Sequence, residues 1–222
     1  MGASVPKQFL HLQGKPLLCY PVQAFANAIP GINIILVVPE DQLDSAEIVI
    51  RSYLNDIEVM VLAGGETRFH SVRNGLQRIP DDGGIVFVHD GVRPLVSRDL
   101  ILRCLQQAEE KGSAIPSLPV TDSIRYMENG INKPLKRDNL RIIQTPQTFK
   151  TGILLQAYKQ AYLPSFTDDA TAVEAFGKKI YLIEGDRQNI KVTTPGDMAL
   201  ADALLMAGEK EESLESFLGN DI

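Results

Sequence analysis

Short apolar runs alternate with helical patterns along this chain, and this alternation restricts its fold more than any other feature. The apolar runs have turn residues nearby, as buried parallel strands do, and they span 32–38, 59–63, 85–89 and 114–118, with a further strand expected at 179–184. Helices are expected at 16–28 and 98–111, the second with Ser97 as its N-cap and Gly112 just past its end. The spacing predicts an α/β fold with a doubly wound, mostly parallel sheet.

Residues 123–144 depart from this alternation. The stretch from Ser123 to Met127 alternates, a turn is expected at Glu128-Asn129-Gly130, and the residues that follow are extended and polar. This pattern predicts a projecting β-hairpin arm. Because such an arm has too few apolar residues to be stable alone, we expect it to pack on something, with a second subunit as the expected partner.

The C-terminal part of the chain contains a predicted helix with a clear start. Thr194 is placed to be its N-cap, Pro195 its first residue and Asp197 an acidic residue of its first turn. We expect this helix to end at Gly208 and the acidic stretch 209–222 to form a tail or a short docked helix. A single domain is therefore expected over 1–208, with the arm at about 123–144.

The charge balance excludes several classes of partner. The net charge is −6 and the pI about 5.1, so no long-range positive field would hold the chain on nucleic acid or an anionic membrane, and a phosphate ligand needs a local basic cluster. Cys19 and Cys104 lack metal-ligand spacing, which favours a reducing compartment without disulfides. No apolar run reaches the ~18 residues of a membrane helix and no export signal is visible, so we expect a cytoplasmic protein.

Two loops follow predicted strands at the edge where α/β folds bind their ligands. Asp90 is well placed to hold Mg²⁺ that bridges phosphate oxygens, and an Asp that only caps the next turn fits equally well. Arg93 could pair with a phosphate or with Asp90, and His89 is interpreted as a packed or capping residue. Gly64-Gly65 could let a ligand approach closely or could simply form a tight turn.

Three further positions carry polar groups that could serve a ligand. Lys191 lies between Ile190 and Val192 in a strand-like stretch, which points it away from two apolar side chains, although a solvated lysine on an edge strand is the common case. Asp168-Asp169 is expected to cap a helix, with orientation of Lys191 or of a substrate hydroxyl as the alternative. Ser71 could contact a ligand or lie on a helix surface.

Taken together, these stretches resemble the 2-C-methyl-D-erythritol 4-phosphate cytidylyltransferase family of the non-mevalonate isoprenoid pathway. Each matching segment is weak alone, but they occur in the family's order. They are 6–9, Gly64-Gly65 with Arg68 and Ser71, 88–94, 119–123, 144–149, 167–170 and 189–195. The resemblance implies a nucleotide-binding α/β sheet of the nucleotide-diphospho-sugar transferase type, with a protruding arm that interlocks in a homodimer.

The resemblance also implies a reaction and a set of roles. CTP and 2-C-methyl-D-erythritol 4-phosphate would give 4-diphosphocytidyl-2-C-methyl-D-erythritol and pyrophosphate, with Mg²⁺ as cofactor. By the resemblance, Lys7 would stabilise the transition state, and Arg137 and Lys191 would position the substrate phosphate. The cytidine and metal regions would use Gly65, Glu66, Ser71, Ser123, Asp90 and Arg93, with Asp90 as the metal ligand.

The match departs from the family in one place. Family members carry a first strand and a glycine-rich loop ending in arginine before the segment that matches Met1-Gly2, so we expect an abbreviated sequence or a mis-chosen start codon. Two other functions stay open. Ribitol 5-phosphate cytidylyltransferases share these motifs, and without the loop the chain could be a catalytically inactive dimeric fold.

Overall fold

The computed structural model describes residues 5–81 and 83–218, and for 209–218 only the backbone is described. By its contacts the chain divides into two compact units. The first lies within 1–64, 89–98 and 188–222, and the second within 65–88 and 99–187. The expectation of a single domain over 1–208 stays a prediction.

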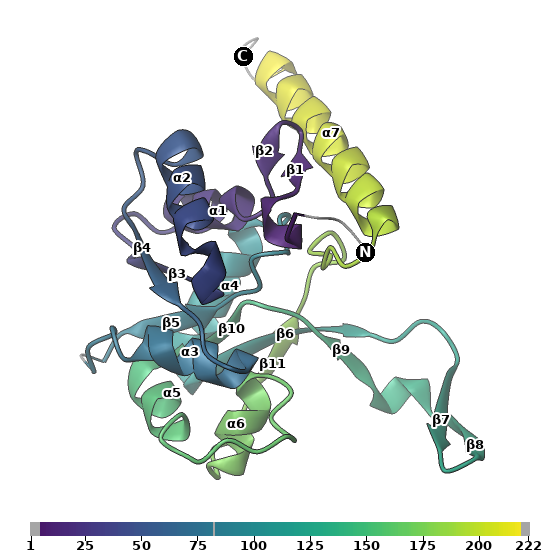
Figure 1. Ribbon diagram of the computed structural model, residues 1–222. Coiled ribbons are helices and arrows are strands. Elements are labelled where there is room, and N and C mark those ends of the chain that lie inside the picture. The colour runs from purple at the N-terminus through teal and green to yellow at the C-terminus, as the bar shows by residue number, and fades with distance from the viewer. Residues whose placement is uncertain (1–4, 82, 219–222) are drawn as a thin grey trace. The chain divides into compact units, whose positions relative to one another are not determined.

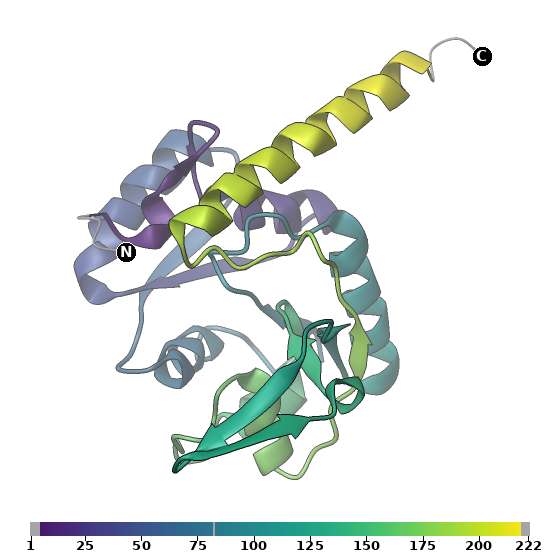
Figure 2. The same cartoon turned by 90° about the vertical axis from the view of Figure 1, so that its right-hand side faces the viewer.

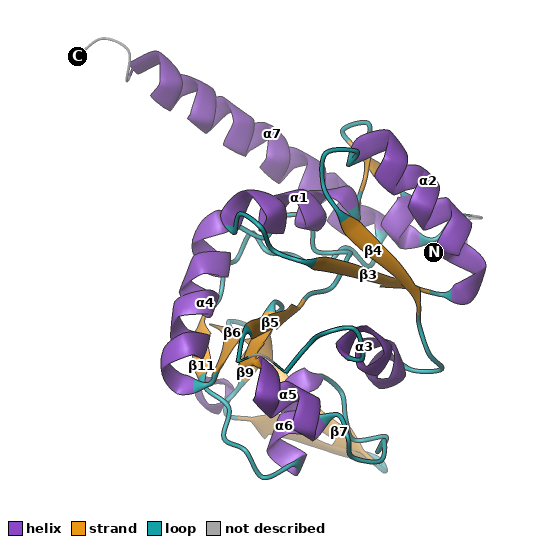
Figure 3. Ribbon diagram, turned by 90° about the vertical axis from the view of Figure 1, so that its left-hand side faces the viewer, coloured by secondary structure: helices purple, strands orange, loops and turns teal. Residues whose placement is uncertain are grey.

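The first unit packs helices against a short parallel sheet. Its elements are η1 (Lys7–Phe9), β1 (His11–Leu12), β2 (Lys15–Pro16), α1 (Cys19–Ala28), β3 (Ile34–Val38), η2 (Glu40–Gln42), α2 (Leu43–Tyr53), β4 (Val59–Ala63) and α7 (Pro195–Leu218), where η marks a 3₁₀ helix. Strands β3 and β4 pair in parallel, and α2 lies beside β4 (Figure 3). Cys19 and Val22 of α1 are buried in a cluster that Ile34 and Leu36 of β3 also contact. The apolar runs therefore form the strands that their composition predicted.

Helix α7 begins as predicted but is longer than predicted. The Oδ2 atom of Asp197 accepts hydrogen bonds from the backbone N–H of Thr193 at 2.9 Å and of Thr194 at 2.7 Å, and the Thr194 hydroxyl accepts from the N–H of Asp197. The predicted end at Gly208 was wrong, because the helix continues to Leu218 (Figure 2). An interior glycine costs about 1 kcal/mol relative to alanine but keeps its helical hydrogen bonds. Within the described residues, no helix has the length and apolarity needed to span a bilayer.

The second unit is built on a five-stranded mixed sheet (Figure 1). Its strand order is β11-β6-β10-β5, with β9 also paired to β6. The strands are β5 (Ile85–Val88), β6 (Ser113–Pro119), β9 (Arg141–Ile143), β10 (Gln147–Lys150) and β11 (Leu182–Glu184), and the helices are α3 (Arg68–Leu76), α4 (Arg98–Lys111), α5 (Thr151–Ala157) and α6 (Asp169–Ala175). Gly112 follows α4 with φ +93°, the left-handed conformation expected of a glycine just past a helix end. The α/β fold class is confirmed, but the expected mostly parallel sheet is not found in this unit. Among its described strands β10 lies between β5 and β6 and pairs antiparallel with both, β9 pairs antiparallel with β6, and β11 pairs with β6 in parallel.

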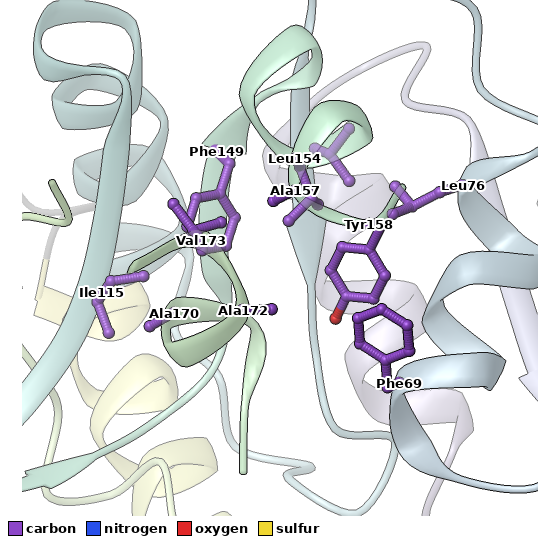
Figure 4. Packing of buried hydrophobic residues seen from close by; sticks show 11 residues of the cluster. Phe69, Leu76, Ile115, Phe149, Leu154, Ala157, Tyr158, Ala170, Ala172 and Val173 are labelled. Atoms are coloured by element: carbon purple, nitrogen blue, oxygen red, sulfur yellow. The ribbon is translucent and has the colours of Figure 1, made fainter. Parts of the chain in front are cut away.

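The core of the second unit lies between the sheet and helices α3, α5 and α6. Phe149 of β10 and Ile115 of β6 are fully buried there together with Leu154 and Val173 (Figure 4). The Phe69 and Tyr158 rings stack with their centroids 4.5 Å apart, which joins the first turn of α3 to the end of α5. This packing fixes the helix that follows the Gly64-Gly65 loop.

The predicted arm is present as a two-stranded hairpin. Strands β7 (Ile124–Glu128) and β8 (Ile131–Leu135) pair in antiparallel register across a turn at Asn129-Gly130, and η3 (Arg137–Asn139) leads back to β9. The hairpin projects from the sheet of its own unit (Figure 1). The hairpin expectation is confirmed, although only 124–135 of the predicted 123–144 form it.

Candidate functional site

Asp90, Arg93 and Lys191 lie together in the first unit. The segment with Asp90 and Arg93 and the segment with Lys191 are about a hundred residues apart in sequence. The Oδ2 atom of Asp90 is 3.0 Å from the ammonium Nζ of Lys191 and 3.3 Å from Nε of Arg93. The Asp90 and Arg93 side chains are nearly buried, whereas the Lys191 side chain is 47% exposed. The carboxylate thus holds one exposed ammonium at the surface, where an anion could reach it.

Arg93 uses its guanidinium inside the protein. Besides Asp90, it donates from Nη1 to the backbone carbonyl of Asn189 at 2.9 Å. Burial lowers the pKa of Arg93 from its usual value, and the adjacent Asp90 carboxylate partly offsets this effect. Of the two roles expected for Arg93, the structure shows the pairing with Asp90. His89 is packed as expected, with its ring against Phe25 and its Nε2 at 3.2 Å from the carbonyl of Arg93.

The segment that carries Lys191 is not a strand in the structure, contrary to its strand-like sequence pattern. Val192 is fully buried and its N–H donates to the carbonyl of Val92 at 2.9 Å, while Ile190 is half-buried and Lys191 exposed. The predicted alternation therefore holds through side-chain burial, without a sheet partner in the described residues. The backbone hydrogen bond from Val192 to Val92 fixes this segment beside the 90–93 loop, where a strand would need several such bonds.

Lys7 lies in a segment that packs on the apolar cluster in which Val192 is buried. It begins η1, and Leu10 just after η1 contacts the cluster that contains Leu12, Val192 and Ala201. Ile190 contacts this cluster as well. The Lys7 side chain is exposed. A common apolar cluster thus holds the segments that carry Lys7 and Lys191.

The Gly65 loop folds over the first turn of α3. The N–H of Gly65 donates to the Ser71 hydroxyl at 3.1 Å, and that hydroxyl donates to the carbonyl of Thr67 at 3.0 Å. A Cβ atom at Gly65 would lie 2.4 Å from the Cβ of His70, so the loop requires glycine here. Ser71 is therefore more than a helix-surface residue, because it ties the loop to the helix. Glu66 is exposed at the tip.

An ion pair that the sequence did not predict anchors α3. Nη1 and Nη2 of Arg68 donate to the two carboxylate oxygens of Asp169 at 3.0 and 2.6 Å. Asp169 is fully buried and also accepts from the Tyr158 hydroxyl. Burial beside this carboxylate raises the pKa of Tyr158 far above its usual value. Asp168 caps α6 as expected, with its Oδ1 accepting from the N–H of Thr171 at 2.8 Å.

The remaining candidates lie at the base of the arm. Arg137 begins η3 and donates to the backbone carbonyl of Thr121, and Ser123 immediately precedes β7. Both side chains are exposed. The structure thus brings together Asp90, Arg93 and Lys191 in one contact set and Gly65 with Ser71 in another, whereas Lys7, Glu66, Ser123 and Arg137 lie outside these contacts.

Asp90 is the carboxylate of this site that could bind a metal ion. Among the described residues, no group of three or more Asp, Glu, His or Cys side chains is arranged to hold a cation. The described side chains therefore do not form a complete set of metal ligands by themselves. Mg²⁺ commonly binds through one or two carboxylates together with substrate phosphates and water, and a single Asp fits that requirement.

These features define an α/β protein of the nucleotidyltransferase type, with a small cationic cluster suited to phosphate oxygens. The sequence model of the IspD family, 2-C-methyl-D-erythritol 4-phosphate cytidylyltransferase, matches residues 1–207. The chain belongs to this family. This membership makes it a cytidylyltransferase by class, and the family resemblance predicted from its motifs is confirmed.

Named relatives and solved structures agree with this assignment. The chain is 46% identical over 206 residues to the cytidylyltransferase of Porphyromonas gingivalis, covering 92% of this chain and 91% of the relative. It is 43% identical over 205 residues to that of Bacteroides fragilis, covering 92% and 93%. The crystal structure of the Thermus thermophilus cytidylyltransferase matches with a TM-score of 0.74 at 32% identity, covering 92% of this chain and 96% of that one. The Anaerococcus prevotii synthase matches with a TM-score of 0.79 at 25% identity, covering 92% of each.

Proposed function

We propose that this chain transfers the cytidylyl group of CTP to 2-C-methyl-D-erythritol 4-phosphate and releases pyrophosphate. The observation that carries the proposal is the Asp90–Arg93–Lys191 contact set, in a chain that belongs to the cytidylyltransferase family. An exposed ammonium held by a nearly buried carboxylate is suited to a phosphate dianion. The product would be 4-diphosphocytidyl-2-C-methyl-D-erythritol.

The chemistry needs placement and charge neutralisation more than a base. A phosphate monoester has its second pKa near ~6 and is mostly dianionic at pH 7, so its oxygen can attack the α-phosphorus of CTP directly. The new P–O bond forms as the bond between the α-phosphorus and the bridging oxygen breaks, and pyrophosphate leaves with that electron pair. Lys191 and Arg137 would hold the attacking phosphate in line, and Lys7 would neutralise charge on the α-phosphoryl oxygens.

Of the other candidate residues, some would serve the metal ion and the rest would contact the nucleoside. Asp90 would hold Mg²⁺, which supplies further neutralisation of phosphate charge when bound. Arg93 would serve this region by holding Asp90 in place, as its buried contacts suggest. Gly65, Glu66, Ser71 and Ser123 would contact the cytidine, and the exposure of Gly65, Glu66 and Ser123 supports this role.

A homodimer formed through the arm is part of the proposal. Paired residues on neighbouring strands share a face of the hairpin, so the register places Ile124, Tyr126, Ile131 and Leu135 on one side together with Glu128 and Lys133. Ile131 is 55% exposed and Leu135 37% exposed. Exposed apolar side chains on a two-stranded hairpin are stabilised when a second chain covers them. We place the working enzyme in the cytoplasm, consistent with two free, buried cysteines.

Substitution of Lys191 tests the proposed reaction. Pyrophosphate release from CTP, Mg²⁺ and 2-C-methyl-D-erythritol 4-phosphate is expected to fall by about 10²–10³-fold in Lys191→Ala, the range seen when one charge-stabilising donor is removed. The melting temperature is expected to stay nearly constant, because half-exposed ion pairs contribute only about 0–1 kcal/mol. Lys178→Ala, at an exposed lysine, is the control and should retain full activity.

Two outcomes would contradict these assignments separately. Equal activity in Lys191→Ala and the unsubstituted chain would remove Lys191 from the reaction. Absence of pyrophosphate release with the unsubstituted chain would overturn the function itself. Ribitol 5-phosphate serves as the competing substrate, and a higher kcat/KM with it would replace methylerythritol phosphate as the acceptor.

A further inference from the structure

Lys7 begins a short 3₁₀ turn, η1, which backbone hydrogen bonds hold on one side. The N–H of Leu10 donates to the carbonyl of Lys7 at 3.1 Å and closes the turn. The N–H of Leu18 donates to the carbonyl of Gln8 at 3.1 Å and joins the turn to the start of α1. The Lys7 side chain itself is exposed. The position of its ammonium therefore depends on how well η1 is held.

The side chain of Gln8 holds the other side of this turn. Its Nε2 donates to Oε1 of Gln42, which lies 34 residues further along the chain and ends η2. Both glutamines belong to the first unit. Both are half-buried, which partly shields their hydrogen bond from water. The contact thus links η1 directly to η2.

η2 is itself fixed between a strand and a helix. It follows β3, whose last residue, Val38, is buried and accepts a hydrogen bond from the N–H of Gly64 at 2.7 Å. The N–H of Gln42 donates to the carbonyl of Pro39 at 2.9 Å, and α2 begins at the next residue, Leu43. Gln42 is therefore a well-held partner for the three-residue turn that carries Lys7.

We propose that Gln8 and Gln42 are positioning residues for Lys7. The hydrogen bond between their side chains ties η1 to η2 and fixes the backbone from which the Lys7 ammonium reaches the α-phosphoryl oxygens of CTP. Neither glutamine needs to contact a substrate in this role. The proposal rests on the proposed function of Lys7. Because a misplacement of about 1 Å can cost about 10²-fold in rate, a side chain that acts through another residue still alters the rate.

Gln42→Met tests the proposal, because methionine has a similar volume and lacks the amide. Lys7 would act on charge that develops in the transition state, so kcat should fall by about tenfold while KM for both substrates stays within about twofold. The loss should stay below about 10²-fold because the hydrogen bond from Leu18 remains. Gln42→Glu keeps an oxygen that accepts from Nε2 of Gln8, and its kcat should stay within about twofold.

Combined substitutions separate positioning from a general weakening of the fold. Gln8→Met should lower kcat as much as Gln42→Met, and the double variant should be no slower than either, because both changes break the same hydrogen bond. In a Lys7→Ala background, Gln42→Met should cost less than about twofold. Exchange of the Leu10 amide, which closes η1, should become faster in Gln42→Met, and this readout does not depend on activity.

Gln23→Met is the matched control. Gln23 is also half-buried in the first unit, and its Oε1 accepts from Nζ of Lys15 at 2.6 Å, so its amide binds outside η1 and η2. It should change neither kcat nor the exchange of the Leu10 amide. Gln8→Met serves as the second variant should Gln42→Met fail to fold.

Four results would overturn the proposal. They are an unchanged kcat in folded Gln42→Met, an equal loss in Gln42→Glu, losses that multiply in the double variant with Gln8→Met, and an equal loss in Gln23→Met. Inactivity of the unsubstituted chain would instead overturn the proposed function, and the exchange of the Leu10 amide would still report whether the two glutamines order η1.

Discussion

Arg68 and Asp169 each occupy a position that would be unfavourable for a charged side chain without a partner of opposite charge. Arg68 occupies the first turn of α3, where the positive end of the helix macrodipole disfavours a cation. Asp169 is a fully buried carboxylate, which is costly to desolvate. Each is stabilised by the other through two hydrogen bonds, and the Tyr158 hydroxyl adds a third to the carboxylate. The ion pair therefore stabilises the fold only when both side chains are present.

Arg68→Ala is expected to lower the free energy of unfolding by about 3 kcal/mol, because it leaves the buried Asp169 carboxylate without its cation. The value lies at the low end for a buried pair since the Arg68 side chain is 38% exposed. Urea unfolding measures it. Arg51→Ala is the control, because Arg51 pairs with Glu47 on an exposed helix face, where such pairs contribute about 0.3–0.5 kcal/mol. Similar losses in the two variants would contradict the assigned importance of burial.

At the scale of elements, α7 depends on the groups at its first turn. Hydrogen bonds from Thr193 and Thr194 to the Asp197 carboxylate lower the pKa of Asp197 to about 2. A carboxyl group whose pKa is lower in the folded state stabilises the fold above its unfolded pKa, near ~4. That contribution is lost as the pH falls from about 4 toward 2.

Asp197→Asn should therefore lower the melting temperature at pH 7, and the difference from the unsubstituted chain should shrink between about pH 4 and 2. Melting temperatures across this pH range measure the effect. Asp202→Asn, one to two turns further along the same helix, should show a smaller gap at pH 7. A gap for Asp197→Asn that stays constant down to pH 2 would exclude the carboxylate as its cause.

At the scale of the whole molecule, assembly should depend on the arm. Ile131→Glu combined with Leu135→Glu replaces two exposed apolar side chains of the hairpin by charges, and burying unpaired charges in an interface is unfavourable. We expect the dimer Kd to rise at least about tenfold, measured by analytical ultracentrifugation. Ile48→Glu alters an apolar residue that is 65% exposed on α2 and should leave assembly unchanged. A monomeric unsubstituted chain at tens of micromolar would contradict the proposed dimer.

The sequence predicted those parts of the fold that follow local rules. Apolar runs located β3 to β6, turn residues located the arm, and Thr194 with Asp197 located the start of α7. Strand β10 was not predicted, because its buried residues include the polar Gln147 and Thr148, which a hydrophobic pattern assigns to the surface. Gln147 instead binds Asp168 and the N–H of Ala170.

The candidate site was predicted by residue type and only in part by partner. The pairing of Arg93 with Asp90 was one of its two expected roles, whereas the contact of Lys191 with Asp90 was not predicted. Asp90 and Arg93 were singled out from their positions after a strand, and Lys191 from its alternation with two apolar residues. The structure adds that Arg93 donates to the carbonyl of Asn189. Arg68 and Asp169 are 101 residues apart, and Gln8 and Gln42 are 34 residues apart. No local pattern connects residues at such separations, so these contacts needed the folded chain.

The sharing of the Asp90 carboxylate has a consequence for which anions can compete at this position. Lys191 already rests on an internal counter-ion, so an arriving ligand exchanges one ion pair for another and gains only the difference. A singly charged, weakly binding anion such as chloride gains little from that exchange, whereas a dianionic ester gains more. The Asp90 contact therefore makes Lys191 selective for doubly charged ligands over singly charged ones.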